Sequence, residues 1–204
     1  MNDKQCKPPL AERRVDIERR GRVAEMSPEE MRRHLLTSEV SGLPNRRAFD
    51  EAGKAPAFAM CDVDGLKALN DRYWYEVGNA LLKATGEALR KAGLDAYHDK
   101  GDEFLARGRN RKQLQTGLEC ARAILRGRTV IVKRGNGEIL RFTGADFSYG
   151  VGKDLDEAEA RLKRHKAERE ARRETERGKL CGIRVEYRSP LTLLSLKTSA
   201  RSRP

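Results

Sequence analysis

Two acidic motifs inside apolar stretches constrain the fold of this chain most strongly. The first, Asp62-Val-Asp-Gly-Leu-Lys-Ala-Leu-Asn-Asp71, directly follows the apolar run Ala57-Phe-Ala-Met-Cys61. That run predicts a buried strand, and a carboxylate at the end of a buried strand loses hydration unless a cation meets it. The second motif, Lys100-Gly-Asp-Glu-Phe104, predicts a tight hairpin turn because Gly101 has the necessary backbone freedom. Carboxylates from a strand end and a neighbouring turn are what a magnesium–triphosphate site requires.

Apolar periodicity and turn signals predict alternating helices and strands along the chain. Ser27-Pro-Glu-Glu30 is typical of a capped helix start, and Gly135-Asn-Gly137 is typical of a hairpin turn. The expected strands are 56–62, 95–99, 103–107, 129–133, 138–142 and 145–151, and the later helices are 45–52, 65–91, 111–126 and 154–174. This order predicts an α+β fold in which helices pack on a sheet.

The composition predicts a globular middle with charged ends. Charged residues make up 36% of the 204-residue chain, against 38% hydrophobic residues. We expect a charged N-terminal helical segment (1–35), one domain (36–170) and a basic, partly disordered tail (171–204). No apolar run is long enough to span a bilayer and the N-terminus has no signal-peptide core, so the expectation is a cytoplasmic protein without a membrane partner. The four cysteines show no paired metal spacing.

The net charge of +12 raises nucleic acid as a second kind of partner. Much of the basic surplus lies near the C-terminus, where solvated charge runs are the usual interpretation. Aromatic residues are only 5% of the chain, and no basic stretch is interleaved with aromatics as a base-stacking groove requires. Nonspecific nucleic-acid contact through the basic tail is therefore the lesser alternative.

Taken together, these motifs resemble the GGDEF family, the diguanylate cyclases that join two GTP molecules into cyclic di-GMP. Three further segments agree with that family in order and spacing: Leu43-Pro-Asn-Arg-Arg-Ala-Phe49, Gly78 with the helix after it, and Ser148-Tyr-Gly-Val151 followed by a helix that reaches Lys166. The resemblance covers roughly residues 36–170. It implies a palm-like nucleotidyl cyclase fold with a central, mainly antiparallel sheet flanked by helices, a Mg²⁺ or Mn²⁺ cofactor, GTP as substrate and a homodimer.

The resemblance also implies roles for individual residues. The implied metal ligands are Asp62, the carbonyl of Val63, and Asp102. Asp102 and Glu103 are the implied catalytic pair, with Glu103 positioning or activating the attacking 3′-hydroxyl. The implied substrate-binding residues are Lys67 and Lys166 for the phosphates, Asn70 and Asn79 for the guanine, and Gly101 for close backbone approach.

The same residues have structural interpretations. Asp62 at a strand end can cap the next helix, although Asp64 suits that role better by position. Asp102 and Glu103 can belong to a solvated turn. His98 is expected at the rim of the hairpin.

Several positions depart from the family pattern. Lys100 stands at the first glycine of the family name, and Asn79 stands at an aspartate that contacts guanine. Trp74 stands where the family has a glycine that lines the base pocket. Its ring is expected either to block the pocket or to stack on the base, and the structural alternative is a tryptophan in the core or on a dimer surface. Lys91-Ala-Gly-Leu94 lacks the Arg and Asp of the family's product-inhibition site, so we expect no inhibition through it. These departures favour an alternative function, a degenerate GGDEF module that binds a nucleotide or a protein partner without turnover.

Overall fold

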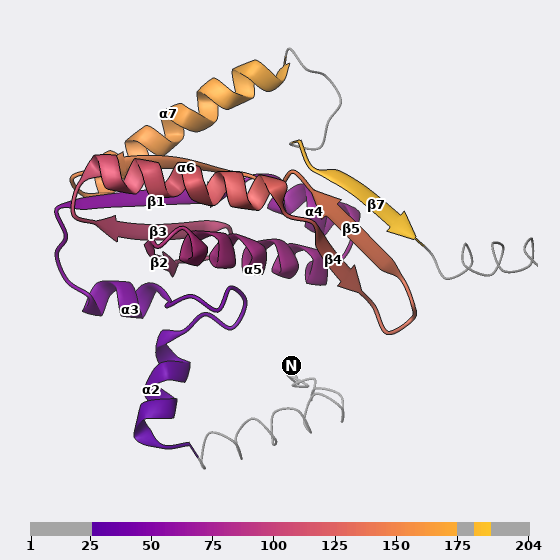
Figure 1. Ribbon diagram of the computed structural model, residues 1–204, viewed down its shortest axis with the longest axis horizontal. Coiled ribbons are helices and arrows are strands. Elements are labelled where there is room, and N and C mark those ends of the chain that lie inside the picture. Colours follow the sequence, from indigo (N-terminus) through magenta and orange to yellow (C-terminus); the bar gives the residue numbers. More distant parts are fainter. Residues whose placement is uncertain (1–25, 175–181, 189–204) are drawn as a thin grey trace, which may run out of the picture. The chain divides into compact units, whose positions relative to one another are not determined.

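The computed structural model of the protein describes residues 26–174 and 182–188 (Figure 1). The chain divides into two compact units, Met1–Thr37 and Ser38–Pro204. In the first unit, helix α2 (Pro28–Leu36) begins with a capping box, because the Ser27 hydroxyl accepts from the Glu30 N–H and the Glu30 carboxylate accepts from the Ser27 N–H. The predicted start of this helix is confirmed. The rest of the expected N-terminal segment, before residue 26, and the tail beyond residue 188 lie outside the described residues.

In the described part of the second unit the strands form two antiparallel sheets. The larger has the strand order β2-β3-β1-β6, built from β1 (Ala57–Val63), β2 (Asp95–His98), β3 (Glu103–Gly108) and β6 (Phe147–Gly152). The smaller has the order β4-β5-β7, built from β4 (Val130–Lys133), β5 (Ile139–Thr143) and β7 (Arg184–Arg188). The central antiparallel sheet of an α+β fold is thus confirmed. Strand β7, in a segment that we expected to be tail, was not predicted.

Five helices of the described ranges accompany these sheets: α3 (Arg46–Glu51), α4 (Leu66–Arg72), α5 (Tyr75–Lys91), α6 (Arg111–Gly127) and α7 (Leu155–Glu174). The single helix expected over 65–91 is wrong, since the chain breaks at Tyr73 and Trp74 into α4 and α5. Trp74 has extended backbone angles and is the N-cap residue of α5. No helix in the described ranges combines the length and the apolar character needed to cross a membrane.

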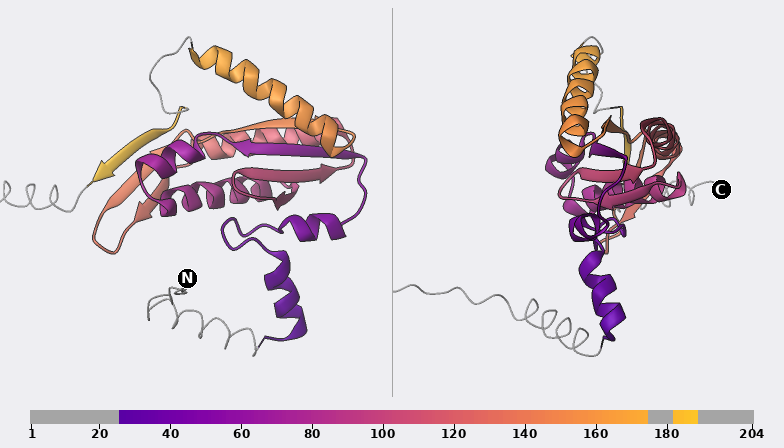
Figure 2. Two further views of the ribbon diagram at one scale, coloured as in Figure 1. Left: turned by 180° about the vertical axis from the view of Figure 1, so that it is seen from behind. Right: turned by 90° about the vertical axis from the view of Figure 1, so that its left-hand side faces the viewer.

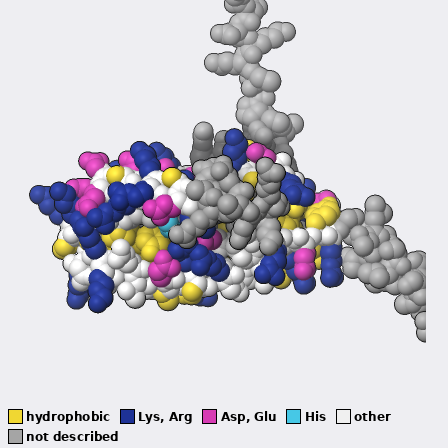
Figure 3. All heavy atoms as spheres, turned by 90° about the horizontal axis from the view of Figure 1, so that it is seen from above, with side chains coloured by type: hydrophobic (Ala, Val, Ile, Leu, Met, Phe, Trp, Pro, Cys, Tyr) yellow, Lys and Arg dark blue, Asp and Glu magenta, His cyan; other side chains and the backbone are white. Residues whose placement is uncertain are grey.

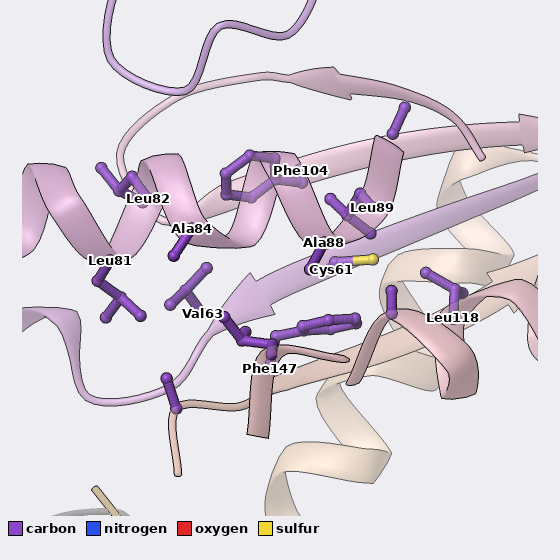
Figure 4. Packing of buried hydrophobic residues seen from close by; sticks show 14 of the residues in the cluster. Cys61, Val63, Leu81, Leu82, Ala84, Ala88, Leu89, Phe104, Leu118 and Phe147 are labelled. Atoms are coloured by element: carbon purple, nitrogen blue, oxygen red, sulfur yellow. The ribbon is translucent and has the colours of Figure 1, made fainter. Parts of the chain in front are cut away.

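The two faces of the larger sheet are covered by different helices (Figures 1 and 2). On one face Cys61, Val63, Phe104 and Phe147 pack with leucines of α5 and α6, including Leu81, Leu89 and Leu118 (Figure 4). On the other face Phe58, Met60 and Leu105 pack with Phe49 of α3 and Leu155 of α7. Because successive side chains of a strand alternate, Asp62 lies on the face of Phe58 and Met60, which is the α7 side.

The side chain of Trp74 packs against the smaller sheet. Its ring lies 4.5 Å from the Arg134 guanidinium and 6.0 Å from the edge-on ring of Tyr187 on β7. Tyr73 makes a further edge contact at 6.2 Å. This packing agrees with the core interpretation of Trp74.

Candidate functional site

Strands β1 and β3 bring two acidic residues face to face. In their antiparallel register Asp62 lies opposite Glu103, one step beyond the pair Cys61 and Phe104. Directly opposed residues share a face, so both side chains lie on the α7 side of the sheet. Asp62 is buried, with 8% of its surface exposed. Because like charges opposite each other destabilise a sheet, this pair needs a nearby cation.

The turn between β2 and β3 is held against the end of β1. The Val63 N–H donates to the Asp102 carbonyl at 3.0 Å, which fixes the turn beside the carboxylate of the preceding residue. Gly101 has a φ of +53°, a left-handed conformation that favours glycine. His98 is buried, not at the rim as expected. Its Nε2 lies 3.0 Å from the Gly101 carbonyl and its Nδ1 lies 2.7 Å from the hydroxyl of Ser38, so the imidazole ties the turn to the start of the domain.

Two lysines meet the opposed carboxylates. Lys166 Nζ, on α7, lies 2.6 Å from Asp62 Oδ2, and Lys100 Nζ, in the turn, lies 3.6 Å from Glu103 Oε2. Burial raises the pKa of Asp62, the hydrogen bond from Lys166 lowers it, and the charge of Asp102 raises it again, with a net upward shift. Lys166 alone therefore does not offset the burial and negative charge around Asp62.

Asp64 does not cap helix α4, contrary to expectation. The N-cap residue is Gly65, in a left-handed conformation and without a side-chain cap. The Asp64 carboxylate instead accepts from the Ser148 hydroxyl at 3.1 Å and lies 2.9 Å from the Arg169 guanidinium. The reason is electrostatic, because a buried carboxylate is stabilised more by a cation from α7 than by the N–H groups of a seven-residue helix.

A further buried carboxylate, Asp146, was missed by the sequence analysis. It lies just before β6 and contacts three guanidinium groups: Arg122 at 3.0 Å, Arg126 at 2.7 Å and Arg169 at 2.6 Å. Arg169 thereby joins α7 to both Asp64 and Asp146. The available signal was an acidic residue in the otherwise apolar stretch Ala145-Asp-Phe-Ser-Tyr149, which requires a buried cation.

The implied substrate-binding residues on α4 and α5 form a separate group. Lys67 is exposed on the first turn of α4, Asn79 is exposed on α5, and Asn70 is half-buried near the end of α4. Within residues 26–174 and 182–188, no hydrogen bond or ion pair joins these three to Asp62, Asp102 or Glu103. Asn70 Oδ1 is buried without a hydrogen-bond partner in that part of the chain, so this acceptor is unsatisfied.

Gly78 makes room for the Asn70 amide, because a Cβ at this position would overlap Asn70 Oδ1. We expect Gly78→Ala to turn the amide away and to weaken nucleotide binding about tenfold, as for the loss of one hydrogen bond. The fold should persist, since the displaced atom ends a flexible side chain and alanine favours helix. Calorimetric titration of Gly78→Ala, Asn70→Ala and the double variant checks this. Additive losses in the double variant would contradict it.

The donor set at the end of β1 fits a divalent cation that binds together with a phosphate. Among the residues that the structure describes, no group of three or more His, Cys, Asp or Glu side chains is arranged to hold a metal ion. Mg²⁺, however, commonly takes one or two carboxylates and completes its shell with water and substrate phosphates. Asp62 and Asp102, which lie close enough for their charges to interact, supply that number.

Charged side chains of both signs are interspersed on the face that carries α6 and α7, seen from above in Figure 3.

A cavity of about 890 Å³ lies elsewhere, at the opposite end of β1, with Pro56, Leu94, Arg107 and Lys112 among its lining residues. None of the carboxylates described above lines this cavity, so it is distinct from the site at the Asp62 end of the sheet.

Comparison with known proteins finds similarity to diguanylate cyclases. No protein-family model matches the chain. Diguanylate cyclase VdcA of Vibrio cholerae is 36% identical over 84 residues, which are 36% of this chain and 25% of that protein. An uncharacterised protein of the hutH 5′ region of Streptomyces griseus is 37% identical over 92 residues, 37% of this chain and 38% of that protein. The chain therefore spans less than half the length of either relative.

Solved structures show the same fold. The crystal structure of diguanylate cyclase SiaD with its activator SiaC, from Pseudomonas aeruginosa, matches with a TM-score of 0.53 and 25% identity, over 78% of this chain and 73% of that one. The coiled coil and GGDEF domain of DgcB from Caulobacter crescentus, in complex with c-di-GMP, matches with a TM-score of 0.50 and 22% identity, over 78% and 88%. The α+β arrangement of the larger sheet and its helices is thus that of GGDEF domains.

Proposed function

We propose that this chain, which is a divergent member of the GGDEF-domain family, is a diguanylate cyclase-type nucleotidyltransferase that condenses two GTP molecules into cyclic di-GMP with Mg²⁺. The observation that carries the proposal is the juxtaposition of Asp62, Asp102 and Glu103 at one end of the sheet, with Lys166 of α7 against them. A lysine beside a carboxylate cluster suits a phosphate that arrives with its own cation.

In this proposal each residue of the site has its own role. Asp62, the Val63 carbonyl and Asp102 hold Mg²⁺ or Mn²⁺, which supplies charge stabilisation at the reacting phosphate. Lys67 and Lys166 bind the phosphates, and the turn at Gly101 allows close approach of the backbone. Asn70 and Asn79 contact the base. Glu103 orients the 3′-hydroxyl that attacks the α-phosphate of the other GTP, with pyrophosphate as the leaving group.

The proposed reaction needs two copies of the chain. Each copy binds one GTP, and each 3′-hydroxyl attacks the α-phosphate held by the other copy, so one site completes only half of the product. Incubation with Mg²⁺ and each of the four nucleoside triphosphates, followed by mass spectrometry, tests the reaction. Cyclic di-GMP from GTP supports it, and the absence of a cyclic dinucleotide at high protein concentration contradicts it.

A specific observation favours a second candidate, a GGDEF module without turnover. Protein cations already contact the acidic residues at this end of the sheet, with Lys166 on Asp62, Arg169 on Asp64 and Lys100 near Glu103. A site neutralised in this way binds a nucleotide or a protein partner without the electrostatics of phosphoryl transfer. Nucleotide binding measured by calorimetry, together with no cyclic dinucleotide in the mass-spectrometric assay, identifies this case.

Binding of nucleotide with metal is expected to require Asp62. Asp62→Ala removes a carboxylate that is close to Asp102 and buried at the strand end. We expect the affinity for Mg²⁺–GTP to fall at least about tenfold, as when a metal environment loses a supporting group. Isothermal titration calorimetry measures it, with Asp156→Asn, at an exposed position in the first turn of α7, as control. Equal affinities of Asp62→Ala and the parent would refute the site.

A further inference from the structure

The ion pair between Lys166 and Asp62 joins a partly exposed ammonium group to a nearly buried carboxylate. The side chain of Asp62 is 12% exposed, whereas that of Lys166 is 44% exposed, and their charged atoms lie 2.6 Å apart. A contact of this length is a charge-assisted hydrogen bond. The ammonium group can therefore leave to solvent by a rotation of its own side chain, while the carboxylate cannot.

Asp62 depends on this ammonium group when no other cation is present. It faces Glu103 across the sheet, the Asp102 turn is hydrogen-bonded to the neighbouring Val63, and Asp64 follows two residues later. Burial adds to the cost of its charge. Lys166 is the one cation in hydrogen-bond contact with the Asp62 carboxylate among the described residues.

Contacts on either side of Lys166 anchor helix α7, whereas the lysine side chain itself is partly exposed. Three residues further along α7, Arg169 binds both Asp64 and Asp146, which anchors the helix to the end of the sheet. Four residues earlier, Leu162 is buried. The Cα atom of a lysine on such a helix stays in place. Its flexible four-carbon side chain lets the ammonium group contact different acceptors nearby.

We propose that Lys166 is an exchangeable counter-ion of the carboxylate site. In the metal-free chain its ammonium group contacts Asp62, and it moves to a nucleotide phosphate when metal and nucleotide bind together. This inference rests on the proposed function, because only a metal–nucleotide complex brings both a new cation for Asp62 and a new anion for Lys166. Free metal must displace the ammonium group without giving it an acceptor. The site therefore selects the metal–nucleotide complex over free metal, through a positive coupling between the two.

The exchange predicts effects of opposite sign for two ligands in one variant. Lys166→Gln removes the competing charge, so free Mn²⁺ should bind about two- to fivefold tighter, in the range of a partly exposed ion pair. The same variant loses the phosphate partner, so Mn²⁺ with a non-hydrolysable GTP analogue should bind about tenfold weaker. Electron paramagnetic resonance follows free Mn²⁺, and calorimetry follows the complex. The matched control is Lys163→Gln on the same helix, where a 73% exposed lysine pairs with Glu159.

The outcomes separate this inference from the proposed function. If Lys166→Gln leaves Mn²⁺ binding unchanged or weaker while Asp62→Ala removes it, the exchange is wrong and the metal–nucleotide site stands. If Lys166→Gln binds Mn²⁺ tighter but binds the GTP analogue like the parent, Lys166 does not transfer to phosphate and the exchange is again wrong. If the parent binds neither Mn²⁺ nor the analogue, both proposals fail.

Discussion

Replacing Asp146 with alanine is expected to lower the free energy of unfolding by about 3–5 kcal/mol at neutral pH, the usual cost of removing one partner from a buried ion pair. The side chain of Asp146 is 6% exposed and contacts Arg122, Arg126 and Arg169. Without it Arg122, whose side chain is 10% exposed, keeps the exposed Glu119 as its one acidic partner among the described residues. Urea unfolding monitored by circular dichroism measures the loss.

Two variants separate the charge of Asp146 from ordinary surface effects. Asp146→Asn retains the shape and should lose an intermediate amount. Glu119→Gln removes the exposed partner of the same guanidinium, at 3.0 Å, and should cost less than about 1 kcal/mol. An Asp146→Ala variant as stable as Glu119→Gln would show that the arginine cluster contributes little to the fold.

The same carboxylate gives stability a pH dependence of known sign. Burial raises the pKa of Asp146, but hydrogen bonds from Arg122 and Arg126 and the charge of Arg169 lower it more, to about 2 from an ordinary 3.8. Because the pKa is lower in the folded state, this contribution is complete above the ordinary value and is lost as the pH falls from about 4 to about 2. The difference in unfolding free energy between parent and Asp146→Asn should therefore shrink over that window.

Local sequence signals predicted most of the fold because they act within a few residues. The Ser27 capping box, the Asn136-Gly137 turn and the apolar run before Asp62 all correspond to elements in the structure. Strand β7 was missed although it carries a short strand pattern, in which Ile183, Val185 and Tyr187 alternate with charged residues. Its sequence, Arg184-Val-Glu-Tyr-Arg188, is mostly charged, and its place comes from pairing with β5 more than forty residues earlier. Tertiary pairing of this kind overrides weak local preference.

The placement of Trp74 depended on the same missing strand. The interpretation as a pocket residue came from the resemblance, because Trp74 stands at a family glycine that lines the base pocket. Without β7, the sequence did not show which residues surround the ring in the fold. With β7 in place, Tyr187 and Arg134 surround the ring. Similarly, the metal role of Asp62 came from the resemblance, and the capping role of Asp64 came from its position along the chain. Their contacts with Lys166 and Arg169 required knowing how α7 crosses the sheet.

Replacing Gly150 with alanine is expected to lower the free energy of unfolding by about 3 kcal/mol, at the upper end of the cost of overpacking. Gly150 lies in β6 under helix α7, and a Cβ there would overlap the backbone of Ala158 and Leu162. Gly152 has the same relation to the helix, with the Ala158 nitrogen 2.6 Å from the position of a Cβ. Backbone atoms cannot rotate away, so α7 itself must move off the sheet.

This variant tests how the fold positions the site, because α7 carries both Lys166 and Arg169. A helix displaced at Gly150 should separate Lys166 from Asp62, so any folded fraction of Gly150→Ala should bind the metal–nucleotide complex more weakly than the parent. Gly127→Ala is the matched control, since a Cβ at the end of α6 meets no atom within 4 Å. Thermal and urea unfolding give the stability, and calorimetry gives the affinity. If Gly150→Ala equals Gly127→Ala in both measurements, the close approach of α7 to β6 does not hold the site together.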